Sequence, residues 1–156
     1  LYQYFPDKDS LVHEIVRRFT GEILGILARD LSRFRGVPLA ELVRGMIGAI
    51  IAVHRLYPEL HRVLKDEVRL TPTLGALSEY EDSVLMLLEE EFEERRAELR
   101  DFNPKLVSFI LAHSVEASVR AFVLAQEKLV SEESFADELT GMVLRFISKD
   151  SSERGS

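Results

Sequence analysis

Two ionisable residues, His54 and Glu81, interrupt runs of apolar residues that repeat at helical spacing. Such runs face the interior of a protein, where an ionisable side chain is costly unless it is paired or hydrogen-bonded. Two interpretations are open. Either the two side chains satisfy each other or a backbone carbonyl in the core, or they line a cavity between the second, fourth and fifth helices and orient a mostly apolar ligand.

A second group of polar residues shares one side of a later helical segment. Phe109, His113, Glu116 and Arg120 fall within a narrow sector of the helical wheel, and the last two have the spacing of an ion pair. This sector is either the wet edge of its helix or a polar wall of the same cavity. A carboxylate there favours a cationic or hydrogen-bond-donating ligand, although His54 leaves an acidic ligand open. The expected pocket residues are Met46, Ile50, His54, Glu81, Val84, Leu88, Phe109, His113 and Glu116.

The sequence lacks the patterns that catalysis and metal binding usually need. Its four histidines form no His-x-x-x-His pair, and it contains neither a Glu-x-x-His motif nor a phosphate-binding glycine-rich loop. Glu81 and Glu116 could form an acid/base pair, but nothing near them resembles a nucleophile or an oxyanion hole. We therefore expect no enzymatic activity, no metal and no cofactor.

The composition favours a single helical domain. Of the 156 residues 46% are hydrophobic, only eight are Gly and five are Pro, and the remainder is rich in Leu, Ala, Glu and Arg. Such usage favours helix over sheet and supplies enough apolar side chains for one core. The predicted fold is an all-α bundle of about six helices.

Capping and proline signals mark where these helices begin and end. Asp7 is a predicted N-cap, Gly36 followed by Pro38 is a stop signal, and Asn103–Pro104 repeats the pattern of a cap and a first-turn proline. The predicted helices span about 8–34, 38–56, 58–69, 72–100, 104–128 and 132–148. We interpret the charged end of the fourth helix, Glu89 to Arg100, as solvated, with Glu91 and Arg95 at the spacing of an ion pair.

Charge and cysteine content limit the possible partners of this portion. A net charge of −7 and a pI near 5.2 argue against a nucleic-acid surface, because phosphate binding needs clustered Lys and Arg. The absence of cysteine excludes disulfides and zinc–thiolate sites and is compatible with a reducing cytosol. No apolar run reaches membrane-spanning length. We expect a cytoplasmic protein with no membrane partner.

The last two predicted helices carry more apolar surface than one chain of this size can readily cover. A copy related by a two-fold axis would cover them in a four-helix bundle, whereas the alternative is that both pack only within one chain. The expected interface residues are Leu111, Ser114, Val115, Ser118, Phe122, Ala125, Leu139, Met142, Val143 and Phe146.

The chain opens with Leu1-Tyr2-Gln3-Tyr4-Phe5, and Lys8 and Leu11 follow at helical spacing. This stretch resembles the junction of the tetracycline-repressor (TetR) family of transcriptional regulators, in which Leu-Tyr-x-Tyr/His-Phe-x-x-Lys-x-x-Leu closes the helix-turn-helix headpiece and opens the helix to the regulatory domain. In that family the matching Tyr and Lys hold DNA phosphates, and the neighbouring positions lie at the DNA surface. The resemblance therefore implies DNA contacts for Tyr2, Gln3, Tyr4 and Lys8.

The resemblance also implies a function and a division of the chain. The function is that of a ligand-responsive regulator, most often a repressor, which forms a homodimer through its last two long helices. Residues 1–8 would be the end of the headpiece, 8–148 the ligand-binding and dimerisation domain, and 149–156 a disordered tail. A small amphipathic or aromatic effector would move the first long helix as a lever, and the missing part of the headpiece would bind operator DNA. The alternative is a helical ligand carrier or small helical enzyme with no DNA role.

Overall fold

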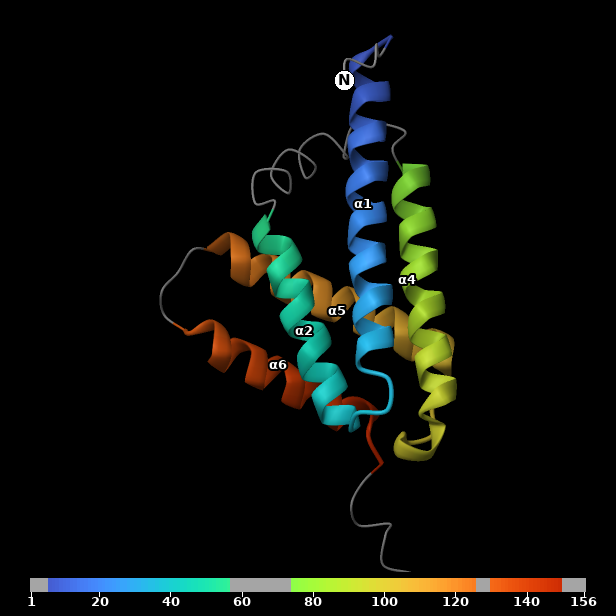
Figure 1. The fold of residues 1–156 in the computed structure, drawn as a ribbon, viewed down its shortest axis with the longest axis vertical. Coiled ribbons are helices and arrows are strands. Elements are labelled where there is room, and N and C mark those ends of the chain that lie inside the picture. Colours follow the sequence, from blue (N-terminus) through green and yellow to red (C-terminus); the bar gives the residue numbers. More distant parts are fainter. Residues whose placement is uncertain (1–5, 57–73, 126–129, 150–156) are drawn as a thin grey trace, which may run out of the picture.

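The computed structural model describes residues 6–56, 74–125 and 130–149. These residues form five α-helices and one 3-10 turn, which confirms the all-α prediction (Figure 1). The short helix predicted over 58–69 lies outside the described residues. The elements are α1 (Lys8–Arg33), α2 (Leu39–Leu56), α4 (Leu74–Glu94), η1 (Arg96–Glu98), α5 (Pro104–Ala125) and α6 (Glu132–Ile147).

Local signals set most of the helix ends. Asp7 caps α1 by accepting a hydrogen bond from the Ser10 backbone N–H at 2.7 Å, and this bond holds the pKa of the Asp7 carboxyl below its ordinary value. Gly36 follows α1 with a φ of +82°, a left-handed conformation that favours glycine. Asn103 accepts hydrogen bonds from the first turn of α5, and Ser131 caps α6 by accepting from the Ser134 N–H.

The fourth helix ends at Glu94 and not near Arg100, so its predicted end was wrong. A 3-10 turn follows, and Leu99 then becomes extended and forms an antiparallel bridge with Ser148. Backbone hydrogen bonds flank this bridge, from Arg100 N to Ile147 O at 3.0 Å and from Lys149 N to Glu98 O at 3.2 Å. A tertiary contact therefore overrides the helical propensity of the charged run. It also holds Lys149, the first residue of the predicted tail.

The helices pack as two crossing groups (Figure 1). The helices α1 and α4 lie side by side and run in the same direction, with α2 packed against α1. The helices α5 and α6 run antiparallel to each other and cross this group, with α5 against α2 and α4 and α6 against α2. Since α2 contacts α1, α5 and α6, it is the central helix, as its apolar sequence suggests.

Two glycines of α2 differ in their surroundings. A methyl group added at Gly45 would overlap the ring of Phe34, whereas one added at Gly48 would meet nothing within 4 Å. Gly45 therefore lets Phe34, the residue that follows α1, pack directly onto the backbone of α2.

We predict opposite effects for the two alanine substitutions. Gly48→Ala should stabilise the fold by about 0.5–1 kcal/mol, because alanine loses less backbone entropy in a helix. Gly45→Ala should destabilise it by about 1 kcal/mol or more, because the overlap with Phe34 outweighs that gain. Urea unfolding followed by circular dichroism measures both. An equal stabilisation by the two variants would contradict the close packing at Gly45.

Candidate functional site

A cavity of about 170 Å³ lies between the helices. A single water needs roughly 10–15 Å³ by a comparable measure, so the space can hold an organic molecule. All five α-helices and the segment after α4 contribute to its lining. The apolar lining residues are Ile23, Leu27, Leu31, Leu39, Leu42, Val43, Met46, Ile47, Ile50, Val53, Val84, Leu87, Leu88, Phe92, Leu99, Leu111, Ala112, Val115, Val143 and Ile147.

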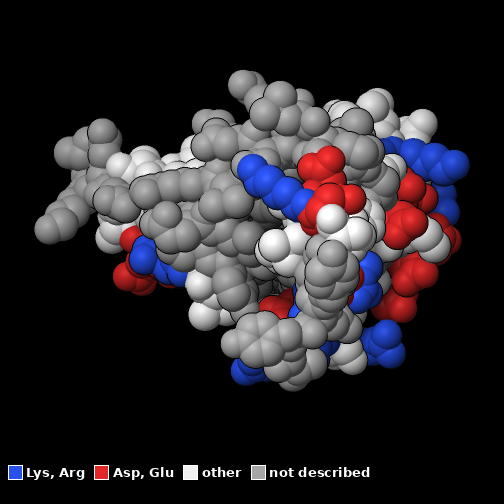
Figure 2. Space-filling view, turned by 90° about the horizontal axis from the view of Figure 1, so that it is seen from above, with Lys and Arg blue, Asp and Glu red and all other residues white. Residues whose placement is uncertain are grey.

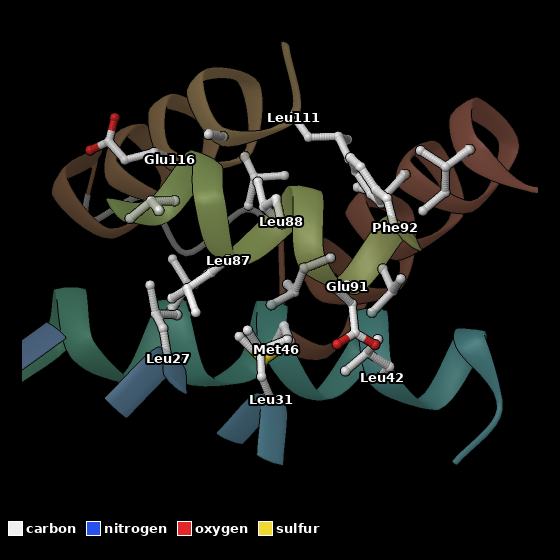
Figure 3. A pocket seen from close by; sticks show the side chains of 18 of the residues that line it. Leu27, Leu31, Leu42, Met46, Leu87, Leu88, Glu91, Phe92, Leu111 and Glu116 are labelled. Atoms are coloured by element: carbon white, nitrogen blue, oxygen red, sulfur yellow. The ribbon is translucent and has the colours of Figure 1, made fainter. Parts of the chain in front are cut away.

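The polar lining residues form two groups. His54, Tyr80 and Glu116 make up one group, and Glu91 and Arg95 make up the other. Figure 3 shows Glu116 and Glu91 well apart, with apolar side chains of α1, α2 and α4 between them. The cavity thus has an apolar middle and a polar group on either side, which is a suitable arrangement for an amphipathic molecule.

His54 is buried, with 5% of its surface exposed. Its Nδ1 lies 2.9 Å from the carbonyl oxygen of Ile50, and its Nε2 lies 3.5 Å from Oε1 of Glu116. The same carboxylate oxygen is 3.3 Å from Nη1 of Arg120. His54 therefore bonds to a backbone carbonyl and faces Glu116, and it does not pair with Glu81 as one interpretation proposed.

Tyr80 places a phenol beside this pair. Burial raises the pKa of Tyr80 to about 12, and the negative charge of Glu116 adds to the shift. Both causes disfavour the phenolate, so Tyr80 remains a neutral hydroxyl at physiological pH.

Arg95 dominates the other polar group. Only 9% of its side chain is exposed, and its Nε donates to Oε1 of Glu91 at 2.5 Å. Its Nη1 donates to the carbonyl oxygen of Val37 at 2.8 Å and to Oε1 of Glu98 at 3.2 Å, and its Nη2 donates to the carbonyl oxygen of Phe34 at 3.2 Å. We call these contacts the Arg95 network. It joins the turn between α1 and α2 to the end of α4.

The Arg95 network corrects the interpretation of the charged run as solvated. The ion pair between Glu91 and Arg95 is present as predicted, but both side chains are largely buried and line the cavity. A second hollow of about 280 Å³, lined by residues of the α1–α2 turn, of the end of α4 and of the segment after it, shares Glu91 and Arg95 with the cavity. Arg95 thus lies between the cavity and the end of α1.

The structure brings together six of the nine expected pocket residues. Those that line the cavity are Met46, Ile50, His54, Val84, Leu88 and Glu116. The other three gather outside it. Glu81 is paired with Nε2 of His113 at 2.9 Å, with roughly half of each side chain exposed, and the ring of Phe109 lies 4.3 Å from that of His113.

The expectation that Glu81 faces the interior was therefore wrong. Glu81 does lie on the helical sector of Leu88 and Phe92, but nearer to the start of α4. At that level this face of α4 meets the polar edge of α5, where His113 is exposed, whereas the neighbouring face, with Tyr80 and Val84, lines the cavity. The wet-edge interpretation thus fits Phe109, His113 and Arg120, whereas Glu116 reaches the cavity.

Sequence reasoning missed several lining residues. Tyr80 and Leu87 share the helical face of Val84, so an extended wheel of α4 could have found them. The spacing of Glu91 and Arg95 was noticed, but no local signal indicated that the α1–α2 turn would cover them.

Four of the expected interface residues lie inside the single chain. Leu111, Val115, Leu139 and Val143 are between 5% and 9% exposed and belong to the main hydrophobic core. Their placement on a partner-facing surface was wrong, because α5 and α6 turn these side chains toward α2. The remaining residues are half-buried or exposed, and they are Ser114, Ser118, Phe122, Ala125, Met142 and Phe146.

Lys8, one of the expected DNA contacts, is exposed and begins α1, whereas Tyr2, Gln3 and Tyr4 lie outside the described residues. Viewed from the N-terminal end of α1, acidic and basic side chains of the described residues are interspersed (Figure 2). This mixture agrees with the net negative charge of the sequence.

Within the described part of the chain, no group of three or more His, Asp or Glu side chains could hold a metal ion. One described helix, α5, is long and apolar enough to cross a membrane by length and composition, with a mean hydropathy of 1.5 over an 18-residue window, so the expectation that no apolar run reaches this length was wrong. Core helices of soluble proteins meet the same criterion, and α5 packs against α2 and α4.

Comparison with known families decides what kind of domain this is. The sequence model of the tetracycline repressor-like C-terminal domain matches residues 38–146. The chain belongs to the TetR family. The match lies outside the first eleven residues, so it confirms the resemblance from an independent part of the sequence. In TetR-family regulators this domain is regulatory.

Two other comparisons give no information on function. No curated protein matches the sequence. A solved structure, that of a protein with unknown function from Rhodococcus sp. RHA1, is similar with a TM-score of 0.77 at 9% identity, covering 94% of this chain and 77% of that one. At this identity the similarity shows the fold alone.

We predict that Arg95→Met destabilises the fold by about 3–5 kcal/mol. The substitution leaves the Glu91 carboxylate buried without its cation and removes the donor to two backbone carbonyls. Arg96→Met is the matched control, because Arg96 is 77% exposed and its ion pair with Glu93 is on the surface. The control should change stability by no more than about 0.5 kcal/mol. Similar unfolding midpoints for the two variants would contradict a structural role for the Arg95 network.

Proposed function

We propose that this chain is the ligand-sensing and dimerisation domain of a TetR-family transcriptional regulator that acts as a repressor. The observation that carries the proposal is the cavity, which has an apolar middle and polar groups on two sides. A core of this size normally packs without such space, so an apolar cavity of about 170 Å³ is a cost that ligand binding would explain. Membership of the TetR family supports a regulatory role.

The Arg95 network supplies a route from the cavity to α1. Leu27 and Leu31 of α1 line the cavity, and Arg95 lines it while holding the carbonyl of Phe34 at the end of the same helix. A ligand that changes the position of these side chains would shift α1 relative to α4. This coupling requires the ligand to bind one arrangement of the helices more tightly than the other.

A shift of α1 would also move its N-terminal end. The first turns of α1 extend beyond the start of α4 (Figure 1). A DNA-reading headpiece joined there, in which Tyr2, Gln3, Tyr4 and Lys8 contact DNA, would be moved relative to its copy in a dimer. The spacing of the two headpieces would then match DNA half-sites one helical turn apart more closely or less closely. We place such a regulator in the cytoplasm, where it reaches operator DNA.

The homodimer that this mechanism needs would form on an exposed apolar face of α5. Leu106 and Ile110 are 57% and 39% exposed, and Ala117 and Ala121 continue the same face. On α6, Met142 is 41% exposed. Small residues let helices approach closely, and a two-fold axis would pair this face with itself. This surface takes the place of those predicted interface residues that are buried, Leu111, Val115, Leu139 and Val143.

We predict that the chain sediments as a dimer and that Ile110→Glu converts it to a monomer, because the new carboxylate would be buried at the interface. Met86→Glu is the control, since Met86 is 62% exposed and lies on a different helix, α4, and the variant should remain dimeric. Sedimentation equilibrium measures the mass of each. A monomeric native chain, or an Ile110→Glu variant that remains dimeric, would overturn the proposed interface.

Ligand sensing is tested by filling the cavity. Ala112 lines it from α5, so Ala112→Phe should occupy the space, whereas Ala52→Phe adds the same ring on the exposed side of α2. In a thermal-shift screen of amphipathic amines, acyl compounds and aromatic acids, compounds that stabilise the native chain should also stabilise Ala52→Phe. They should lose most of their effect on Ala112→Phe. A ligand at 100 times its Kd stabilises by about 2.7 kcal/mol, which such a screen detects. Equal shifts for both variants would place binding outside the cavity.

A further inference from the structure

The carboxylates that line the cavity are paired within the protein. Oε1 of Glu116 lies 3.3 Å from Nη1 of Arg120 and 3.5 Å from Nε2 of His54. On the other side of the cavity, Arg95 donates to Oε1 of Glu91 at 2.5 Å. Each lining carboxylate thus has a cationic partner, and this holds for both protonation states of His54. A charged ligand of either sign would lose its hydration among apolar side chains and would have to replace one of these contacts.

The hydroxyl of Tyr80 differs from these groups. Tyr80 lines the cavity and packs against apolar side chains of α1 and α2, including Ile23 and Val53. Within the described residues, no protein group forms a hydrogen bond with its hydroxyl. Burial is the main cause that raises the pKa of Tyr80 to about 12, and the charge of Glu116 is the second, so the hydroxyl is largely removed from water and lies on the Glu116 side of the cavity. A polar group in this position is costly until a partner reaches it.

We propose that the effector is an uncharged lipophilic molecule with a carbonyl oxygen that accepts a hydrogen bond from the Tyr80 hydroxyl. A phenol donates better than it accepts, because its oxygen shares a lone pair with the ring, so the matching group on the ligand is an acceptor. The cationic ligand that the sequence favours is a donor only and would leave the Tyr80 proton without an acceptor. This inference rests on the proposed ligand-sensing function and adds the chemical class of the ligand.

The apolar middle of the cavity holds the rest of such a molecule. Leu27, Leu87 and Leu88 lie between the two polar groups of the lining (Figure 3). They offer no hydrogen bonds, so one oxygen on an otherwise hydrocarbon body matches the lining.

The experiment compares four probes that share a phenyl ring and a four-carbon chain: butyrophenone, butylbenzene, 4-phenylbutylamine and 4-phenylbutanoate. Isothermal titration calorimetry on the whole chain at pH 7, with each probe below its solubility limit, gives the affinities. The ketone, butyrophenone, should bind about tenfold more tightly than the amine or the carboxylate, because both of these are ions that must lose their hydration.

Tyr80→Phe tests the assigned partner, because it removes the hydroxyl and keeps the ring. It should weaken butyrophenone roughly three- to tenfold, as expected for one lost hydrogen bond. It should leave butylbenzene within about twofold, which also shows that the cavity is intact. Ser83→Ala is the control, since it removes a hydroxyl from the same helix at a position that does not line the cavity, and it should change neither affinity.

The possible failures are distinguishable. If either charged probe binds as tightly as butyrophenone, or if Tyr80→Phe weakens butyrophenone no more than it weakens butylbenzene, the ligand class is wrong and ligand sensing stands. If no probe binds, the ligand class is wrong as well, and the cavity-filling screen then decides whether the chain senses any ligand.

Discussion

The guanidinium group of Arg95 connects parts of the chain that would otherwise be held together only by apolar contacts. It is buried, and it donates to the carbonyls of Phe34 and Val37 and to the carboxylates of Glu91 and Glu98. A buried cation persists only when its donors are satisfied, so these contacts fix one position of the α1–α2 turn against α4. The cavity wall and the end of α1 depend on the same side chain.

This arrangement explains how occupation of the cavity could change the position of the long helix α1. An apolar space surrounded by five helices leaves packing energy unrealised, and a bound molecule would recover part of it. Because the space is bordered by α1 and by the residue that holds the end of α1, the recovered energy would depend on where that helix lies. The polar group around His54 and Glu116 would then determine which molecules can use the space.

Local signals in the sequence predicted much of the fold, but contacts between distant segments decided the rest. Asp7, Gly36 and Asn103 act on the backbone next to them in the sequence, so the helix ends that they mark could be predicted. The end of α4 could not, because it depends on a bridge between Leu99 and Ser148. The helical wheel gave the correct sector for Glu81, yet it carries no information on which part of α4 meets the core and which meets His113.

The central claim is that occupation of the cavity moves α1 in a dimer. The chain has no cysteine, so His13→Cys, at an exposed position of α1, gives one spin label per chain. Pulsed dipolar spectroscopy then measures the separation of the two labels with and without a molecule that calorimetry shows to be bound. The account predicts a defined separation that changes by on the order of 1–2 Å or more on binding. An unchanged separation with the cavity occupied would contradict it.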